Sequence, residues 1–188
     1  MAAADTRTAA ARANLSAAGI AALDPALDAS ANLDLLMKRG LLSDAVRFLA
    51  HSLPKREAVW WACLCARDML PADAAPALLA AVQAAEGWVM APSEEKRREA
   101  MVTAEAAGFR APASWAAVAA FWSGGSMAPP NAPVVPPGDP LTGAAVAGAI
   151  LLAAVQTEPQ KAFEKYRRFL DYGIDIAGGG SGRERQQA

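Results

Sequence analysis

The chain is poor in the residue types on which most catalytic and metal sites depend. It holds one histidine and two cysteines in 188 residues. A single histidine gives a Ser-His-Asp triad or a His-rich metal site only one possible member, and two cysteines do not form a disulfide framework. No P-loop, Gly-x-Gly-x-x-Gly or Gly-x-Ser-x-Gly pattern occurs. We therefore expect no metal, no cofactor and no enzymatic activity.

An excess of charge of either sign is also missing. Lys and Arg number 18 against 19 Asp and Glu, which gives a formal net charge of −1. Nucleic-acid-binding domains carry a basic patch or stripe, so we expect no nucleic-acid partner. The densest charge run, EEKRRE at 94–99, mixes both signs and predicts a solvated helix face with a Glu94–Arg98 pair.

Long apolar segments are scarce. The longest uncharged one, Leu141 to Val155, is shorter than the roughly 20 apolar residues that a membrane-spanning helix needs. The first thirty residues are interrupted by charges such as Asp5, Arg12 and Asp24, so they lack the apolar core of a signal peptide. We expect a cytoplasmic chain without membrane insertion.

Alanine is the residue that the chain has in abundance, while clusters of β-branched residues are almost absent. Alanine loses no side-chain entropy in a helix, and β-branched residues are the ones that favour strands. The composition therefore predicts an all-α fold. We expect a flexible, Ala-rich N-terminal arm over residues 1–30, a single helical domain over 31–177 and a disordered tail over 178–188.

Capping residues, glycines and prolines predict where the helices of this domain begin and end. Asn32 is expected to cap the first helix and Ser93 a later one, and Gly87 and Gly173 are expected to stop the helices that precede them. The expected helices cover residues 33–39, 43–53, 55–70, 72–87, 94–107, 114–121, 140–156 and 160–172.

Two short sequence matches raise the question of a repeat. Arg-Glu-Ala occurs at 56–58 and 98–100, and Met-Ala-Pro at 90–92 and 127–129. Both spacings are roughly 40 residues, the period of helical-hairpin repeats. The helices are expected to pack either as a short HEAT-like stack of hairpins or as an irregular helical bundle.

The segment EAVWWACLCARDML combines two adjacent tryptophans with two cysteines. At about 100° per residue the tryptophans point in different directions, and Cys63 and Cys65 lie roughly 200° apart around the helix. The cysteines therefore share neither a metal nor a disulfide. Trp61 and Cys65 lie away from the face that carries Val59, so they are either core residues of a central helix or contacts for another protein.

Cys65 and His51 are the residues on which a small enzyme would depend. Such an enzyme needs an activated thiolate or a general base. A buried, inert cysteine and a capping or surface histidine near Lys55 are the simpler interpretation.

Nearly half of the chain's 13 prolines fall in MAPPNAPVVPPGDP, residues 127–140. This segment predicts a loop or polyproline II, and its Pro-x-x-Pro spacings suit an aromatic-lined groove in a partner. The alternative is a stiff connector between helices. Small residues in the helix that follows, Ala144 and Gly148 among them, predict a buried position for it. The candidate partner-binding residues of the whole chain are Trp61, Cys65, Trp88, Trp122, Pro133 and Pro136.

Three stretches carry a family resemblance: DAVRFLAHSLPKREAVWWACLCAR (44–67), PLTGAAVAGAILLAAV (140–155) and YRRFLDYGIDIAGG (166–179). They resemble a family of small, uncharacterised helical bacterial proteins that often carry the misleading label "twin-arginine pathway signal protein". That family is associated with type VI secretion genes, and it has no catalytic residues to transfer to this chain.

The resemblance implies a non-enzymatic, protein-binding accessory, an adaptor or chaperone-like component of type VI secretion. Its partner would be a secretion component or an effector. The rival hypothesis is an immunity or regulatory protein that binds a cognate toxin.

Overall fold

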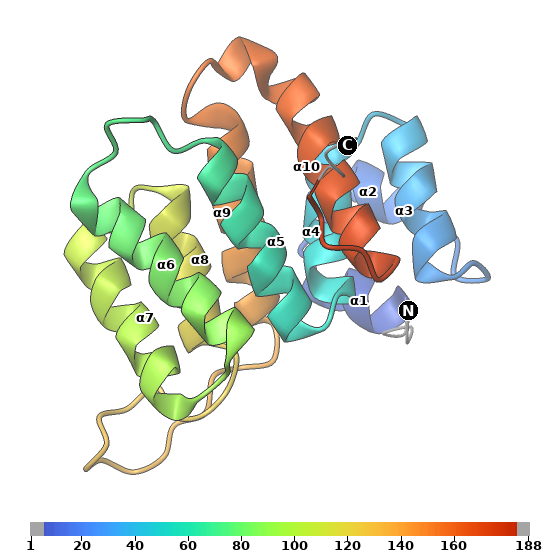
Figure 1. Cartoon of the computed structure of the whole chain (residues 1–188). Coiled ribbons are helices and arrows are strands. Elements are labelled where there is room, and N and C mark those ends of the chain that lie inside the picture. Colours follow the sequence, from blue (N-terminus) through green and yellow to red (C-terminus); the bar gives the residue numbers. More distant parts are fainter. Residues whose placement is uncertain (1–5, 184–188) are drawn as a thin grey trace.

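A computed structural model of the chain describes residues 6–183, and these residues form ten α-helices and one short 3₁₀ turn without any strand (Figure 1). The all-α prediction is confirmed. The helices are α1 Thr6–Arg12, α2 Ala17–Ala22, α3 Ala29–Lys38, α4 Leu42–Ser52, α5 Lys55–Asp68, α6 Pro76–Met90, α7 Glu94–Ala107, α8 Pro112–Phe121, α9 Leu141–Val155 and α10 Ala162–Ala177, with the turn η1 at Pro159–Lys161 before α10.

Helices α5 and α9 lie in the middle of the molecule (Figure 1). On one side α8 packs on both of them and is covered by α6 and α7; on the other side lie α4 and α10, with α1 to α3 outside α4. Helix α9 also contacts α4, five helices earlier in the chain. In a stack of repeats each unit contacts only its neighbours. The arrangement is therefore that of an irregular bundle rather than a HEAT-like stack.

Helix α5 is buried on two sides, and this decides the place of Trp61. The Trp61 side chain is 0% exposed, and its indole Nε1 donates a 2.6 Å hydrogen bond to the carbonyl oxygen of Phe169 in α10. Cys63 and Cys65 are buried as well. Trp61 and Cys65 are thus core residues, whereas the neighbouring Trp60 is half-buried.

Gly173 lies inside α10 and does not stop it. A Cβ at this position would lie 2.7 Å from both Leu49 Cδ2 and Trp61 Cε2, so only glycine lets α10 approach α4 and α5 this closely. The helix ends instead at Gly178, whose N–H donates to the carbonyl of Ile174, and Gly179 follows with a φ of +88°.

Two other helix boundaries differ from the predicted ones. Asp28 caps α3, while Asn32 is buried inside that helix, with its side-chain amide bonded to the backbone of Asp24 and of the loop after it. Helix α6 continues through Gly87, so that Trp88 is helical and only 7% exposed. At α3 one local capping residue, Asp28, takes the place of another, whereas at α6 the helix continues so that Trp88 and Val89 are buried.

Residues 6–22 of the expected N-terminal arm carry two short helices, α1 and α2. Helices α1 and α2 bury Ala9 and Ala22, and α1 packs on α4. Asp44 of α4 holds the turn between them, because its carboxylate accepts hydrogen bonds from the backbone N–H and the hydroxyl of Ser16 at 2.7 and 2.8 Å. The first five residues of the predicted arm lie outside the described residues.

The start of the predicted disordered tail folds back onto α5. Trp60 Nε1 donates to the carbonyl of Ser181 at 2.8 Å, and the Arg183 guanidinium lies 5.0 Å from the centre of the Trp60 ring system. The N–H of Gly182 donates to the carboxylate of Asp175. The remainder of that predicted tail, residues 184–188, lies outside the described residues.

Within residues 6–183 no individual helix has both the length and the apolar character to cross a membrane. Helices α9 and α10 with η1 reach those limits only when taken together, and they are bent by 115° relative to each other.

The close approach at Gly173 gives a stability prediction. Gly173→Ala should lower the free energy of unfolding by about 1–2 kcal/mol, because the cost of overpacking exceeds the gain in helix propensity. The matched control is Gly148→Ala in α9, where no atom beyond the neighbouring backbone of α9 lies within 4 Å of the added Cβ; it should raise the free energy of unfolding by about 0.5–1 kcal/mol. Denaturant titrations of both variants test this, and equal effects would contradict the packing of α10 on Trp61.

Candidate protein-contact surface

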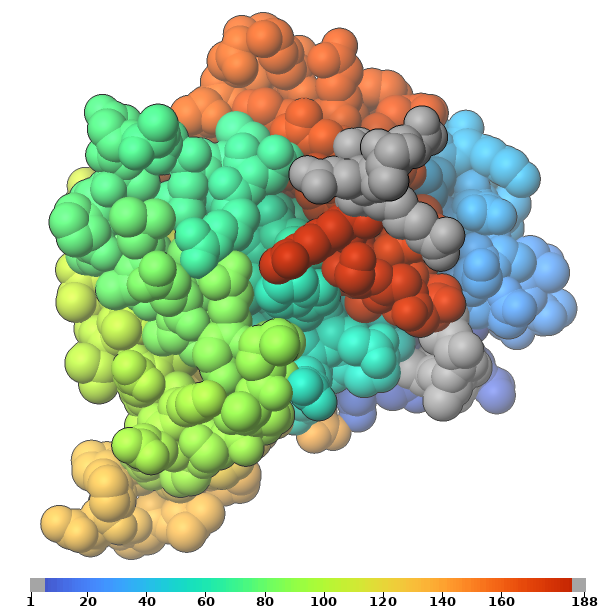
Figure 2. All heavy atoms as spheres, in the orientation of Figure 1, coloured from blue at the N-terminus to red at the C-terminus, as the bar shows by residue number. Residues whose placement is uncertain are grey.

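The segment between α8 and α9 forms a loop that projects from the body of the molecule (Figure 2, gold). We call residues 126–140 the proline-rich loop. Pro133 and Pro136 are both exposed, Val134 is 77% exposed, and no charged residue occurs from 127 to 138. The predicted loop over 127–140 is therefore present as such, and it presents an uncharged, largely apolar tip.

The two limbs of the proline-rich loop are joined near the protein body. The N–H of Met127 donates to the carbonyl of Val135 at 2.8 Å, and the N–H of Val135 donates to the Ser126 hydroxyl at 3.0 Å. That hydroxyl also accepts from the N–H of Ala128. These bonds close residues 128–134 into a tip that stands on a fixed base.

Arg97 of α7 holds the base of the loop through hydrogen bonds to backbone carbonyls. It is only 3% exposed; its guanidinium donates to the carbonyl of Phe121 at 2.6 Å and to that of Ser126 at 2.8 Å, and it lies 4.5 Å from the centre of the Phe121 ring. Arg98 donates to the carbonyl of Ala128 at 3.1 Å. The base of the loop is thus held by charge-assisted hydrogen bonds to backbone carbonyls.

Glu94 completes this cluster. It accepts two hydrogen bonds from Arg97, both at 2.7 Å, and one from Arg98 at 2.6 Å. The bond to Arg97 is the main reason why the pKa of Glu94 is lowered to about 2. The predicted Glu94–Arg98 pair is present, but the charge run is not simply a solvated face, because Arg97 points inward. Sequence patterns do not mark Arg97, since its carbonyl partners lie 24 and 29 residues away.

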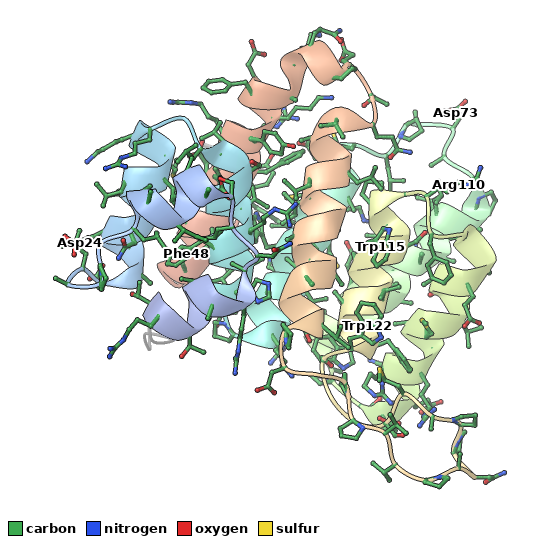
Figure 3. All side chains as sticks on the ribbon, turned by 180° about the vertical axis from the view of Figure 1, so that it is seen from behind. Asp24, Phe48, Asp73, Arg110, Trp115 and Trp122 are labelled. Carbon is green, nitrogen blue, oxygen red and sulfur yellow. The ribbon has the colours of Figure 1, made fainter. Side chains whose placement is uncertain are left out.

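Trp122 lies at the same end of the molecule as the proline-rich loop (Figure 3). It is half-buried, and its carbonyl accepts a hydrogen bond from Thr142 at the start of α9. Its ring packs against Trp115 with centroids 6.3 Å apart, and Trp115 packs against Phe109 at 6.2 Å. Trp122 thus shares this end of the molecule with the loop that carries Pro133 and Pro136, while its own ring packs on Trp115.

The other candidate residues belong to the core. Trp61, Cys65 and Trp88 are all buried within the chain and present no surface to a partner. Burial is the main reason why the pKa of each thiol, Cys63 and Cys65, is raised far above its ordinary value. A raised pKa suppresses the thiolate, which is the nucleophilic form.

His51 lies apart from both cysteines, in the last turn of α4. Burial, followed by the charges of Arg12 and Arg47, lowers its pKa to about 4. Within residues 6–183 no group of three or more His, Cys, Asp or Glu side chains is arranged to hold a metal ion.

The Glu94 cluster predicts a dependence of stability on pH. The pKa of Glu94 is lower in the folded state, so the stabilisation is fully present above its ordinary value of 4.5 and is lost as the pH falls towards 2. Glu94→Gln should therefore destabilise the protein at neutral pH, by less than about 1 kcal/mol because the side chain is 54% exposed. The difference from wild type should shrink below pH 4.

Urea titrations between pH 2.5 and 7 measure this difference. Glu105→Gln is the control, since it removes a carboxylate from the same helix without removing an ion pair recorded in the described residues. A Glu94→Gln effect that stays constant with pH would contradict the arrangement.

The burial of both cysteines predicts slow thiol chemistry. In the native protein, Cys63 and Cys65 should react with a disulfide reagent at least about 1,000-fold more slowly than free cysteine, because only opening of the core exposes them. Both should react at once in denaturant. A Val102→Cys variant supplies the exposed control, since Val102 is 65% exposed on α7. A native thiol that reacts as fast as this control would show that α5 is accessible.

Comparison with known proteins identifies a family and no more. No curated protein matches the chain, and no solved structure matches it. One family model, described as a family of unknown function (DUF6931), matches residues 32–177, from inside α3 to the last residue of α10. The match covers the central helices, the proline-rich loop and its arginine base. The chain therefore belongs to the DUF6931 family.

Proposed function

We propose that this protein is a non-enzymatic, protein-binding accessory that presents the proline-rich loop to a protein partner. The observation that carries the proposal is the contrast between the two parts of the loop. Its base is tied to the buried Arg97 guanidinium, while its tip, with Pro133 and Val134, is exposed.

A loop built in this way favours binding for an energetic reason. Ordering a loop on association costs conformational entropy, and that cost is smaller where the free protein already holds the bound shape. Prolines have fixed φ angles, and the bonds at Ser126 join the two limbs. The tip therefore loses less entropy on binding than an open loop of the same length.

The chemistry of the tip indicates the kind of groove that fits it. The tip offers proline rings, the exposed Val134 side chain and backbone carbonyls, with no charge over residues 127–138. Grooves lined by aromatic side chains bind such segments, with the prolines packed between the rings. Trp122 at the foot of the loop adds a half-buried aromatic surface to the same end of the molecule.

For the biological setting we propose type VI secretion, with a secretion component or effector as the partner. This finer assignment rests on the family resemblance of the three sequence stretches. The exposed loop supports a protein contact, which an adaptor and a toxin-binding immunity protein share.

Site-specific photo-crosslinking tests the proposed contact. A benzophenone amino acid replaces Val134 at the tip of the loop, and the control carries it in place of Val102, which is nearly as exposed but lies on α7. In the native host, the Val134 variant should form a discrete adduct that the Val102 variant does not form. The adduct should be lost when Pro133 and Pro136 are both replaced by Ala.

Mass spectrometry of the adduct then identifies the partner. A secretion component or effector supports the adaptor role, and a toxin supports the immunity role instead. No adduct at Val134, or the same adduct from both positions, would contradict the loop as the contact surface.

A further inference from the structure

A second site lies where α1, α4 and α5 meet the start of α9. It is a cleft of about 210 Å³. We call it the His51 cleft. Five polar or charged residues line it, together with Gly143: Arg12, His51, Lys55, Asp139 and Thr142.

The imidazole of His51 forms one wall of the cleft and is held there by packing. A Cβ at Gly143 would lie 2.5 Å from His51 Nδ1, so the ring lies directly against the glycine. Within the described residues, neither ring nitrogen has a recorded hydrogen-bond partner. Because the pKa of His51 is about 4, the ring is neutral at pH 7 and offers one N–H donor.

Two cations and one carboxylate surround this imidazole in the cleft. Arg12 pairs with Asp139 at 2.9 Å through one terminal nitrogen, and both side chains of this pair are substantially exposed. Lys55 donates to the carbonyl of Ser123 at 3.0 Å. With His51 neutral, the lining groups therefore have a net charge of +1. Arg47 lies outside this lining, and its charge contributes to the lowered pKa of His51.

We propose that the His51 cleft binds a carboxylate group. A single negative charge matches the excess of one positive charge, and a carboxylate can accept hydrogen bonds from the guanidinium, the ammonium and the imidazole together. The volume of the cleft is far larger than a single water molecule needs, which leaves room for a carboxylate with a short carbon chain.

The two helices that start at the cleft reinforce the match. Helices α5 and α9 each begin at its edge, and neither has a side-chain hydrogen bond at its N-cap. The positive ends of both dipoles therefore favour an anion here. An incoming carboxylate would compete with Asp139 for Arg12, since these two residues form the outer edge of the cleft. Asp139 belongs to the last residues of the proline-rich loop, but the proposal does not depend on the contact made by the tip of that loop.

The single histidine of the chain provides the readout. The Cε1–H signal of His51 is followed by NMR at pH 7 during titration with acetate, against sodium chloride at the same ionic strength. We expect a saturable shift of this signal with acetate and none with chloride. Arg12→Gln should weaken acetate binding by about tenfold or more, since it removes a charged donor. The control Arg39→Gln, on the exposed C-cap of α3, should leave it unchanged.

Three further probes distinguish the source of the carboxylate. A capped tripeptide with one central Glu presents a protein side chain, a peptide with a free C-terminus presents a terminal carboxylate, and inorganic phosphate tests selectivity for a single negative charge. Saturable binding of at least one carboxylate probe, tighter than that of phosphate, supports the proposal. A response that matches chloride, tighter binding of phosphate, or undiminished binding by a folded Arg12→Gln variant would overturn it. Lys55→Gln serves in place of Arg12→Gln if that variant does not fold.

Discussion

The hydrogen bond between Trp61 and the backbone of Phe169 is the contact on which the rest of the fold depends. It joins α5 to α10 across more than a hundred residues of sequence, and it forms only because Gly173 has no side chain between them. A buried indole N–H without an acceptor would be costly. With this contact made, α5 is enclosed on two sides, and the chain after α10 can return to cover Trp60.

The proline-rich loop depends on a second buried contact, which joins α7 to the end of α8. Arg97 reaches from α7 to the carbonyls at the end of α8 and at the start of the loop. A buried guanidinium is tolerated only where its donors are satisfied, and here Glu94 and two carbonyls satisfy them. Glu94 neutralises this buried charge, and the hydrogen bond that satisfies a further donor of Arg97 at the Ser126 carbonyl also holds the start of the loop. A structural requirement of the core and the shape of the proposed contact surface thus have one physical cause.

The elements that could be predicted from the sequence are those that local signals define. The all-α class, α7 with its Ser93 cap, and the loop after α8 all follow from composition, capping residues and prolines. Gly87 and Gly173 are both predicted to be helix stops, and neither ends its helix. Helix α6 continues past Gly87 with Trp88 and Val89 buried. At Gly173 the reason is close packing against α4 and α5, which leaves no mark in the neighbouring residues. Arg97 was assigned to a solvated face for the same reason.

The central claim is that the proline-rich loop has a fixed base and an exposed tip before any partner binds. Backbone amide hydrogen exchange of the free protein at single-residue resolution tests it most directly. The account predicts slow exchange at Met127 and Val135, whose amides are bonded across the base, and fast exchange at Asn131 and Val134 in the tip. Equally fast exchange at all four amides would show an unfixed loop and contradict the account.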